Sequence, residues 1–516
     1  MQMPGRRRAG GPPLAHFAEN LLDNLFYYNT GTGSGFVRAA WMVVLLLFGV
    51  LMWGVFFSWG NIAFDFLDWA EVTGPRYALL QDAVRQGVLP LHAANTTALR
   101  GVTDRYFSIA DTPFSPQIVL LGFMEIGRYI FIDTLILYAL GFAGLVLITR
   151  KYQIAPLPFL VMFLLFNFNG FITAHFAVGH SIWTGYFLIP YFVYLVLELL
   201  EREQAGWRWI LGLSTLLLVI LLQGFFHLYL WCLLFLGVLA LINFRLIKPV
   251  VLGGLFSVLF ALPRLLPPSL VLSGITHNFL GGFATVTELI FNMFMMRDPD
   301  RAMELPSNIL PLRWWEQDFF IGLLGFAVLV LFGIIFPLVR DRSRKSVQVQ
   351  LLLACLIFAA LSVGQVYGWI IRILPVPPLT AERVTTRMFG LPLVFLIVLA
   401  AIFFQRWLEE KRAIQTGLPA WIRVLLLGLT VLLFHDLYQH LRAWRVRYLD
   451  GLVYLFPKIP FDAAQHSIAN YPDPIYTGML LGGLAVSVLS FVFLLVMVRR
   501  ERKNDKSLNG SADRSN

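Results

Sequence analysis

The chain has 516 residues, of which 58% are hydrophobic and only 14% carry a charge, and its mean hydropathy is +0.72. Soluble domains carry about 25% charged residues, so this composition excludes a soluble globular protein and indicates one that crosses a membrane several times. The net charge of +10 is explained by basic loops on one side of the membrane, in contact with anionic lipids, and requires no nucleic-acid partner.

Hydropathy predicts an all-α polytopic bundle with about twelve transmembrane helices, several of them near the minimum length of about 17 residues. The predicted spans are 39–60, 129–149, 157–174, 182–200, 209–224, 226–243, 250–270, 318–338, 349–366, 388–405, 419–435 and 477–498. Only two cysteines occur, Cys232 and Cys355, and both lie inside these spans. The sequence therefore predicts neither a disulfide framework nor a thiolate zinc site.

The predicted bundle covers residues 39–498, after a cytoplasmic segment 1–38 and before a polar tail 499–516 that is expected to be disordered. An even number of spans puts both termini on one side of the membrane. Basic clusters such as Arg340 to Lys345 fall on that side, so we expect both termini in the cytoplasm. The long connections then face outward from an inner or plasma membrane, where we expect the protein to act. They are 61–128, 271–317, 367–387 and 436–476.

Two amphipathic helices are predicted in the outer segment 61–128. The first begins at Pro75, carries residues such as Leu80 on an apolar face and stops at Gly87. The second is expected to be capped by Thr112 and to continue to Ile126. Both helices are expected to lie along the outer membrane surface.

An acidic cluster follows the first span directly and consists of Asp65, Asp68 and Glu71. A carboxylate costs several kcal/mol inside a membrane, so three carboxylates at the edge of a span indicate a wet, functional mouth. The alternatives are that Asp65 and Asp68 cap an interfacial helix or pair with Arg76, and that Glu71 is simply solvated.

The stretch FDFLDWAEVTGPRYALLQDAVRQGVLPLH resembles the first outer loop of GT-C superfamily glycosyltransferases. The shared elements are an aspartate seven residues before a proline, here Asp68 and Pro75, and an amphipathic helix that ends in a G-x-LPL motif. That family often continues with Trp-Asn-Pro, where this chain has His-Ala-Ala. Three later stretches are also similar and contain Gly179-His180 with Pro190, Arg264 within ALPRLLPPSLVLSG, and Arg383 with Arg387.

The resemblance implies a GT-C-like bundle that transfers a sugar from a polyprenyl-phosphate donor to a lipid, glycan or protein acceptor. Such a transfer needs a carboxylate to take the acceptor's proton and a cation or metal to hold the leaving phosphate. We predict Asp68 as the base, with Asp65 and His180 as further catalytic candidates. Some members of the superfamily use a divalent metal and others do not, and Mg²⁺ or Mn²⁺ on Asp68 and Glu71 is one option.

Three arginines are predicted to bind substrate. Arg383 and Arg387 are four residues apart, so a helix would present both guanidinium groups on one face toward a lipid phosphate. The alternative is an ion pair with Glu382 or contact with lipid headgroups. Arg264 is costly near a span and would face the cavity, pairing with Asp65, Asp68 or a phosphate, or snorkel to the headgroups.

Two other functions stay open. A transporter or flippase of a lipid-linked substrate would distribute polar residues through many spans, whereas here most ionisable groups cluster at the outer boundary. A polysaccharide polymerase or ligase would carry basic residues in a late outer segment, where this chain has Arg442, Arg445 and Arg447. His435 and His440 are expected on a solvated face. The sequence contains no P-loop and no GxSxG elbow, which argues against an ATPase and a serine hydrolase.

Overall fold

The computed structural model describes residues 23–28, 34–271, 279–296, 314–340, 346–380, 382–415, 417–446 and 461–512. Within these ranges the chain is helical, and strand-like pairing is limited to isolated bridges. The predicted outer segments 271–317 and 436–476 are therefore described only in part, and Arg447 lies outside the described residues.

Nine helices in the described ranges are long and apolar enough to span a membrane, which confirms an all-α polytopic membrane protein. Three further predicted spans correspond to shorter apolar helices, α8 (Trp207–Leu222), α9 (Phe226–Ile242) and α15 (Val347–Leu361). The nine long spans are Gly35–Phe56, Ile126–Tyr152, Pro156–Ala177, Ser181–Arg202, Phe244–Leu265, Gly322–Arg340, Thr385–Ile414, Ala420–Ala443 and Pro474–Asn504.

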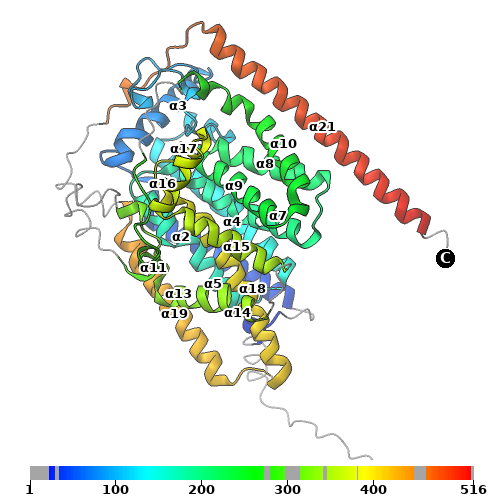
Figure 1. Ribbon diagram of the computed structural model, residues 1–516. Coiled ribbons are helices and arrows are strands. Elements are labelled where there is room, and N and C mark those ends of the chain that lie inside the picture. Colours follow the sequence, from blue (N-terminus) through cyan, green and yellow to red (C-terminus); the bar gives the residue numbers. More distant parts are fainter. Residues whose placement is uncertain are drawn as a thin grey trace, which may run out of the picture.

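Burial sorts these helices into a centre and a perimeter. The most apolar stretch of the span that contains α18 (Gly390–Gln415) is completely buried, and α5 (Pro156–Asn167) packs against α18. By contrast, α19 (Ala420–Ala443) and α21 (Pro474–Ala512) bury about a fifth of theirs. Figure 1 shows α21 along one flank of the bundle. Exposed apolar faces on perimeter helices are what a lipid environment requires.

The C-terminal helix extends beyond the predicted last span. The tail from Arg499 is helical as far as Ala512 instead of disordered. One reason is a contact between helices, because the Glu501 carboxylate accepts hydrogen bonds from the backbone N–H groups of Trp207 and Arg208 at the start of α8. The carboxylate thereby satisfies two donors that the first turn of a helix leaves open.

The helix predicted to begin at Pro75 is confirmed as α3 (Gly74–Gln86), which ends at Gly87 with φ 68° and is mostly buried. The second prediction is wrong. Thr112 caps no helix, since its hydroxyl donates to the carbonyls of Tyr106 and Ile109, and the next helix, α4 (Ile126–Tyr152), begins only at Ile126. Between Thr112 and Ile126 the chain forms only a short 3₁₀ turn, Pro116–Gly122, because loop contacts replace the expected α-helical hydrogen bonds.

The outer segments dock on one another at the end of the bundle where Figure 1 shows α3. In the first segment, Arg105 forms an ion pair of 2.6 Å with Asp473 at the start of α21. Farther along the chain, the backbone N–H of Leu280 donates to the carbonyl of Arg383. The predicted outer segments thus dock in two pairs, 61–128 with 436–476 and 271–317 with 367–387, and the last of these contains α17 (Pro377–Thr380) and most of α16 (Gly364–Ile373).

The remaining helices complete the bundle and position the site described below. They are α2 (Ser34–Phe56), α6 (Gly170–Ala177), α7 (Ile189–Arg202), α10 (Ile247–Leu265), α11 (Val286–Phe294), α13 (Gly322–Val328) and α14 (Phe336–Arg340).

Candidate functional site

The chain reaches Asp68 through an unusually strained connection. After α2, four non-glycine residues adopt positive φ values: Ser58 at 49°, Trp59 at 55°, Phe64 at 55° and Leu67 at 42°. Such residues cost on the order of 1–3 kcal/mol each and persist only where the surroundings hold them. Leu67 lies directly before Asp68, so the backbone is strained next to the predicted base.

The Gly179-His180 motif explains how this segment is held. Gly179 has φ +99°, and a Cβ there would lie 2.3 Å from the backbone nitrogen of Trp69, which only glycine avoids. The Thr73 hydroxyl donates to the Gly179 carbonyl at 2.5 Å, and the Trp69 indole N–H donates to the Ala177 carbonyl at 3.0 Å. The π-helical turn Trp69–Thr73 is therefore fixed against the end of α6, with His180 beside Asp68.

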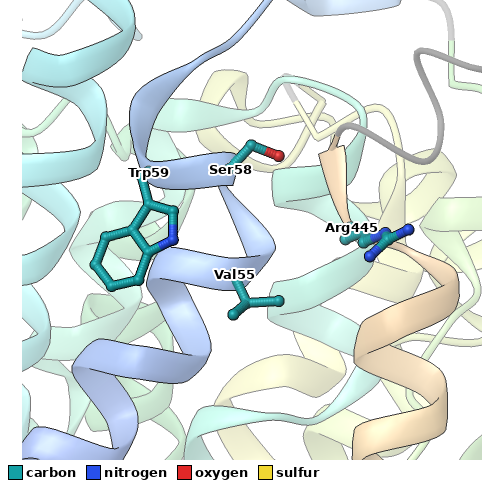
Figure 2. Close-up of a pocket in the computed structure, with 4 residues that line it drawn as sticks. All are labelled: Val55, Ser58, Trp59 and Arg445. Carbon is teal, nitrogen blue, oxygen red and sulfur yellow. The ribbon is translucent and has the colours of Figure 1, made fainter.

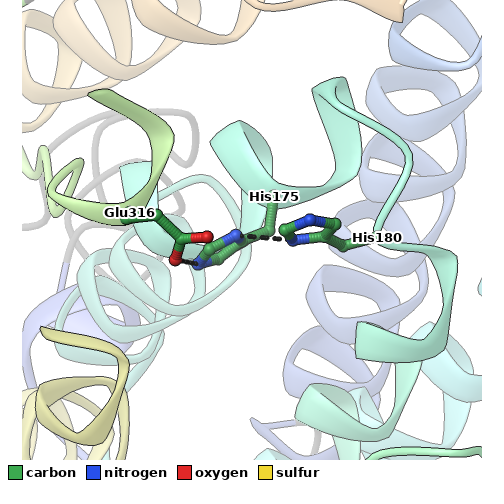
Figure 3. A group of neighbouring side chains, drawn as sticks. All are labelled: His175, His180 and Glu316. Carbon is green, nitrogen blue, oxygen red and sulfur yellow. Dashed lines mark hydrogen bonds and ion pairs between the residues drawn. The ribbon is translucent and has the colours of Figure 1, made fainter. Parts of the chain in front are cut away.

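Asp68 and His180 form the first pair of a line of side chains. His180 Nε2 lies 3.0 Å from Asp68 Oδ2, and His180 Nδ1 lies 2.9 Å from His175 Nδ1. His175 Nε2 in turn lies 4.0 Å from Glu316 Oε2. Figure 3 shows His175 between Glu316 and His180. Four residues from three distant parts of the sequence thus come together at the outer end of α6.

Asp68 is a carboxylate held in its charged form. Burial works to raise the pKa of the Asp68 carboxyl, but the hydrogen bond from His180 and the charges of His180, Arg100 and Arg387 lower the pKa to about 2. Arg100 Nη2 lies 3.4 Å from Asp68 Oδ2 and its side chain is 45% exposed. Asp68 is therefore ionised at neutral pH, in reach of solvent and next to cations.

Arg387 reaches the same site as predicted, but its guanidinium is already paired. Its Nε lies 2.6 Å from Glu316 Oε2 and its Nη2 also bonds Glu316, so a bidentate pair uses one edge of the fork. The group packs over the Trp183 ring at 5.4 Å. Only the remaining edge of the guanidinium is available for a phosphate. A bidentate contact with the substrate through the edge now used requires the Arg387–Glu316 pair to separate.

The prediction that Arg383 and Arg387 share a helix face is wrong. The 3₁₀ turn that contains Arg387 begins at Thr385, and Val384 is extended at φ −133°. Arg383 therefore lies in a loop, where its side chain is exposed and its backbone carbonyl pairs with the 279–281 strand-like segment. Glu382 was the alternative ion-pair partner of these arginines. Its carboxylate instead accepts a hydrogen bond of 2.9 Å from the Trp231 indole N–H.

Glu382 extends the polar surface around Arg387. His227 Nδ1 lies 3.1 Å from Glu382 Oε2. Burial works to raise the pKa of the Glu382 carboxyl, but His227 and Arg387 lower it below its usual value. Nearby, Arg76 pairs with Asp111 at 3.2 Å instead of with Asp65 or Asp68. The surroundings of Asp68 therefore hold several charges of both signs.

Arg264 does not join the site. Its Nη2 donates to the Thr112 carbonyl at 2.7 Å and contacts the Thr112 hydroxyl at 2.9 Å, and the guanidinium packs over Phe107 at 5.2 Å. The predicted pairing with Asp65 or Asp68 is therefore wrong. Arg264 connects α10 to the loop at Thr112 through Nη2, while its buried Nε and Nη1 have no hydrogen-bond partner among the described residues.

Asp65 and Glu71 lie on either side of Asp68 in sequence. Asp65 is partly buried in the strained connection, whereas Glu71 is exposed in the turn Trp69–Thr73. The side chains that come closest to a metal-ligand set within the described ranges are instead His175, His180 and Glu316, whose ligand atoms lie within 4.8 Å of one another. Histidine nitrogens favour Zn²⁺ and related ions, whereas Mg²⁺ favours oxygen ligands. This donor set thus does not fit the expected Mg²⁺.

A separate cavity lies at the outer end of α2. It has a volume of about 370 Å³ and is lined by Val55, Ser58, Trp59 and Arg445 (Figure 2). Arg445 belongs to the late outer segment that the polymerase alternative requires, and Arg442 is exposed nearby in sequence. The cavity is a second place where an anionic headgroup has a basic side chain within reach.

Neither a known protein family nor any curated protein matches this chain. The functional argument therefore depends on the residues and geometry described above.

Several site residues were not found by sequence reasoning. Glu316 and Arg100 belong to two different predicted outer segments and to no recognised motif, and Trp183 lies in the Gly179-His180 stretch but was given no role. A hint for Glu316 was the sequence WWEQD, in which two carboxylates stand at the entrance of an apolar span. His440, expected on a solvated face, is fully buried against Asp318, whereas His435 is exposed as predicted.

Proposed function

We propose that the protein is a membrane glycosyltransferase that moves a sugar from a polyprenyl-phosphate donor to a lipid, glycan or protein acceptor. The observation that carries the proposal is the Asp68–His180 pair, which is 26% and 11% exposed and has Arg100 and Arg387 beside it. A part-buried, ionised carboxylate between cations meets the needs of both halves of the reaction, proton removal and phosphate stabilisation.

In the proposed reaction the acceptor hydroxyl attacks the anomeric carbon, and the bond from that carbon to the phosphate oxygen breaks. The electron pair leaves with the polyprenyl phosphate, and the hydroxyl proton passes to Asp68. Arg100 and the unpaired edge of Arg387 balance the charge that grows on the phosphate.

The low pKa of Asp68 is consistent with this role, because the substrate changes it. Arg100 and Arg387 are among the groups that hold the pKa down, although His180 contributes more. A bound phosphate brings a like charge and draws these cations away, and both effects raise the pKa of a carboxylate. Asp68 therefore becomes a stronger base only when donor is present.

The proposal places the site on the extracytoplasmic face of an inner or plasma membrane, with both termini in the cytoplasm. It is supported by the docking of the predicted outer segments on one another in pairs and by the basic residues on the opposite connections. A cysteine at Ser108 is not a useful probe of this topology, since Ser108 is buried. Exposed Glu71 is the better position for labelling with an impermeant thiol reagent.

A transporter or flippase is the alternative from another class, and the assay separates the two. Purified protein in detergent micelles has no compartments, so only an enzyme releases sugar from labelled polyprenyl-phosphate donors offered with a panel of acceptors. We expect transfer by the native chain and none by Asp68→Asn. No transfer with any donor, together with Asp68-dependent movement of lipid-linked substrate in vesicles, would overturn the proposal.

The polymerase or ligase alternative depends on the cavity at Arg445. It shares the glycosyl-transfer chemistry but needs the basic residues of the late outer segment. Arg445→Ala should leave transfer from a simple polyprenyl-phosphate sugar intact if Asp68 is the centre. Loss of transfer in Arg445→Ala that equals the loss in Asp68→Asn would favour the alternative.

A further inference from the structure

The two histidines of the site present matching atoms to one another. His175 Nδ1 and His180 Nδ1 are 2.9 Å apart, while the Nε2 atoms point away from this contact, toward Asp68 at 3.0 Å and Glu316 at 4.0 Å (Figure 3). Each ring therefore lies between a carboxylate and the other histidine. His175 is buried and His180 is 11% exposed, so the contact lies at the edge of the protein interior.

The Asp68 carboxylate decides where the ring proton of His180 is. A neutral imidazole has one N–H, and a neighbouring carboxylate stabilises that N–H on the nitrogen that faces it. Asp68, at 3.0 Å, therefore holds the N–H of His180 on Nε2 and leaves His180 Nδ1 with a lone pair that faces His175 Nδ1. The contact of 2.9 Å is then made either by a proton on His175 Nδ1 or by a metal ion that both Nδ1 atoms bind.

We propose that His175 and His180 bind one divalent transition-metal ion through their Nδ1 atoms, with Glu316 as the third ligand. Metal-binding histidines almost always donate the other ring N–H to a carboxylate, which is the relation that His180 has to Asp68. Tetrahedral coordination at 2.0–2.1 Å separates two nitrogen ligands by about 3.3 Å, so the rings need to move apart only slightly. Glu316 Oε atoms, within 4.8 Å, need a side-chain rotation.

Arg387 does not prevent this coordination. A carboxylate has about four lone-pair positions, and the bidentate pair with Arg387 uses one on each oxygen. Three protein ligands leave a further position open, which is typical of a catalytic ion and not of a structural one.

The charges around the pair suggest how the ion would be used. Asp68 and Glu316 together balance Arg100 and Arg387, so a divalent ion would give the site a positive charge. An anionic ligand such as a phosphate would occupy the open coordination position and balance this positive charge. In this sense the inference rests on the proposed transferase and gives it a cation, but metal binding itself can be tested with no sugar donor.

The test is a titration of purified, metal-free full-length protein in detergent with Zn²⁺ and with Co²⁺, whose visible absorption reports tetrahedral coordination. We expect one ion per chain and no displacement by Mg²⁺. His175→Ala and His180→Ala should each weaken binding by more than about 100-fold, and Asp68→Asn by about 10–100-fold. His435→Ala, which removes an exposed histidine on α19, is the matched control and should bind normally.

His175 is buried, so its alanine variant requires a check on folding. His175→Gln keeps much of the volume, and a thermal melt in detergent shows whether either variant is folded. Folded variants that bind Zn²⁺ as tightly as the native chain would overturn the inference, as would a native chain that binds none. In the second case a proton on His175 Nδ1 makes the contact between the rings. Metal binding without sugar transfer would instead contradict only the proposed function.

Discussion

Among the described residues, two aspartate–histidine pairs at about 3 Å lie in very different settings. His180 Nε2 lies 3.0 Å from Asp68, and His440 Nε2 lies 2.9 Å from Asp318. The second pair is almost completely buried, at 2% and 0% exposure, whereas the first is in contact with solvent. The distance between the two side chains therefore cannot distinguish a structural pair from a functional one.

The partners of each pair make the distinction. At the buried pair, His440 Nδ1 contacts the Thr173 hydroxyl at 3.3 Å, and Asp318 Oδ1 accepts the Phe320 N–H at 3.1 Å. These two neighbours are neutral groups, one on α6 and one in the segment before α13. At the other pair the neighbours are arginines, a second histidine and strained backbone. Satisfied hydrogen bonds stabilise a fold, whereas clustered charged groups with shifted pKa values near solvent are typical of functional sites.

Turnover should separate the two pairs by the largest margin. Asp68→Asn keeps the shape of the side chain and removes the base, so sugar transfer should fall by about 10²–10⁴-fold, a barrier increase of roughly 3–5 kcal/mol. Asp318→Asn should leave the turnover of folded protein within about tenfold. The measurement is initial-rate transfer in detergent, normalised to folded protein. Equal losses in both variants would erase the distinction.

Thermal stability should show the reverse order. His440→Ala leaves Oδ2 of the buried Asp318 carboxylate without its hydrogen-bond partner, which typically costs at least about 1–3 kcal/mol. His180→Ala removes a partner from a carboxylate that water and Arg100 can still reach, so the cost should be below about 1 kcal/mol. Unfolding in detergent followed by tryptophan fluorescence compares the two. A larger loss of stability in His180→Ala would contradict this account.

Gly179→Ala tests the close approach that places His180 on Asp68. Its positive φ alone costs about 1–2 kcal/mol with a side chain, and the added Cβ would also clash with the Trp69 nitrogen. Gly101→Ala is the matched control, since Gly101 has φ +70° and open space around it. Similar melting temperatures with transfer lost only in Gly179→Ala would sharpen the comparison. Full activity in a folded Gly179→Ala would count against the arrangement.

The pH dependence of stability gives the smallest expected effect. The folded-state pKa of Asp68 is lowered from 3.8 to about 2, so its contribution is fully present above pH 3.8 and is lost as the pH falls toward 2. The stability difference between the native chain and Asp68→Asn should therefore shrink only below about pH 4. Melting curves at several pH values check this. A difference that disappears between pH 7 and pH 5 would mean that the pKa of Asp68 is not lowered.

The sequence predicted the parts of the molecule that local patterns determine. Apolar runs located the spans, and the position of Gly87 predicted the end of α3, because hydropathy and positive φ are properties of a few neighbouring residues. The helix predicted after Thr112 and Pro113 does not form, because contacts of this loop with Arg264 override the capping pattern. The helical tail beyond Arg499 depends on a contact between α21 and α8 that no local pattern reveals.

The candidate site could be predicted only in part. Asp68, His180 and Arg387 were expected together and lie together, since each stands next to a motif or at the edge of a span. Arg264 was expected there and instead contacts a loop, because its Nη2 donates to the backbone carbonyl of Thr112. Glu316 was missed because its role arises from the meeting of three outer connections. Long-range contacts of this kind leave no spacing rule in the sequence.

An experimental structure with a bound polyprenyl-phosphate sugar tests the central claim most directly. The account predicts that the donor phosphate lies within hydrogen-bond distance of Arg100 or Arg387, with the anomeric carbon facing Asp68. It also predicts that Asp318 and His440 keep their contact unchanged. A donor bound in the cavity at Trp59 and Arg445, with Asp68 on no path to its anomeric carbon, would contradict the account.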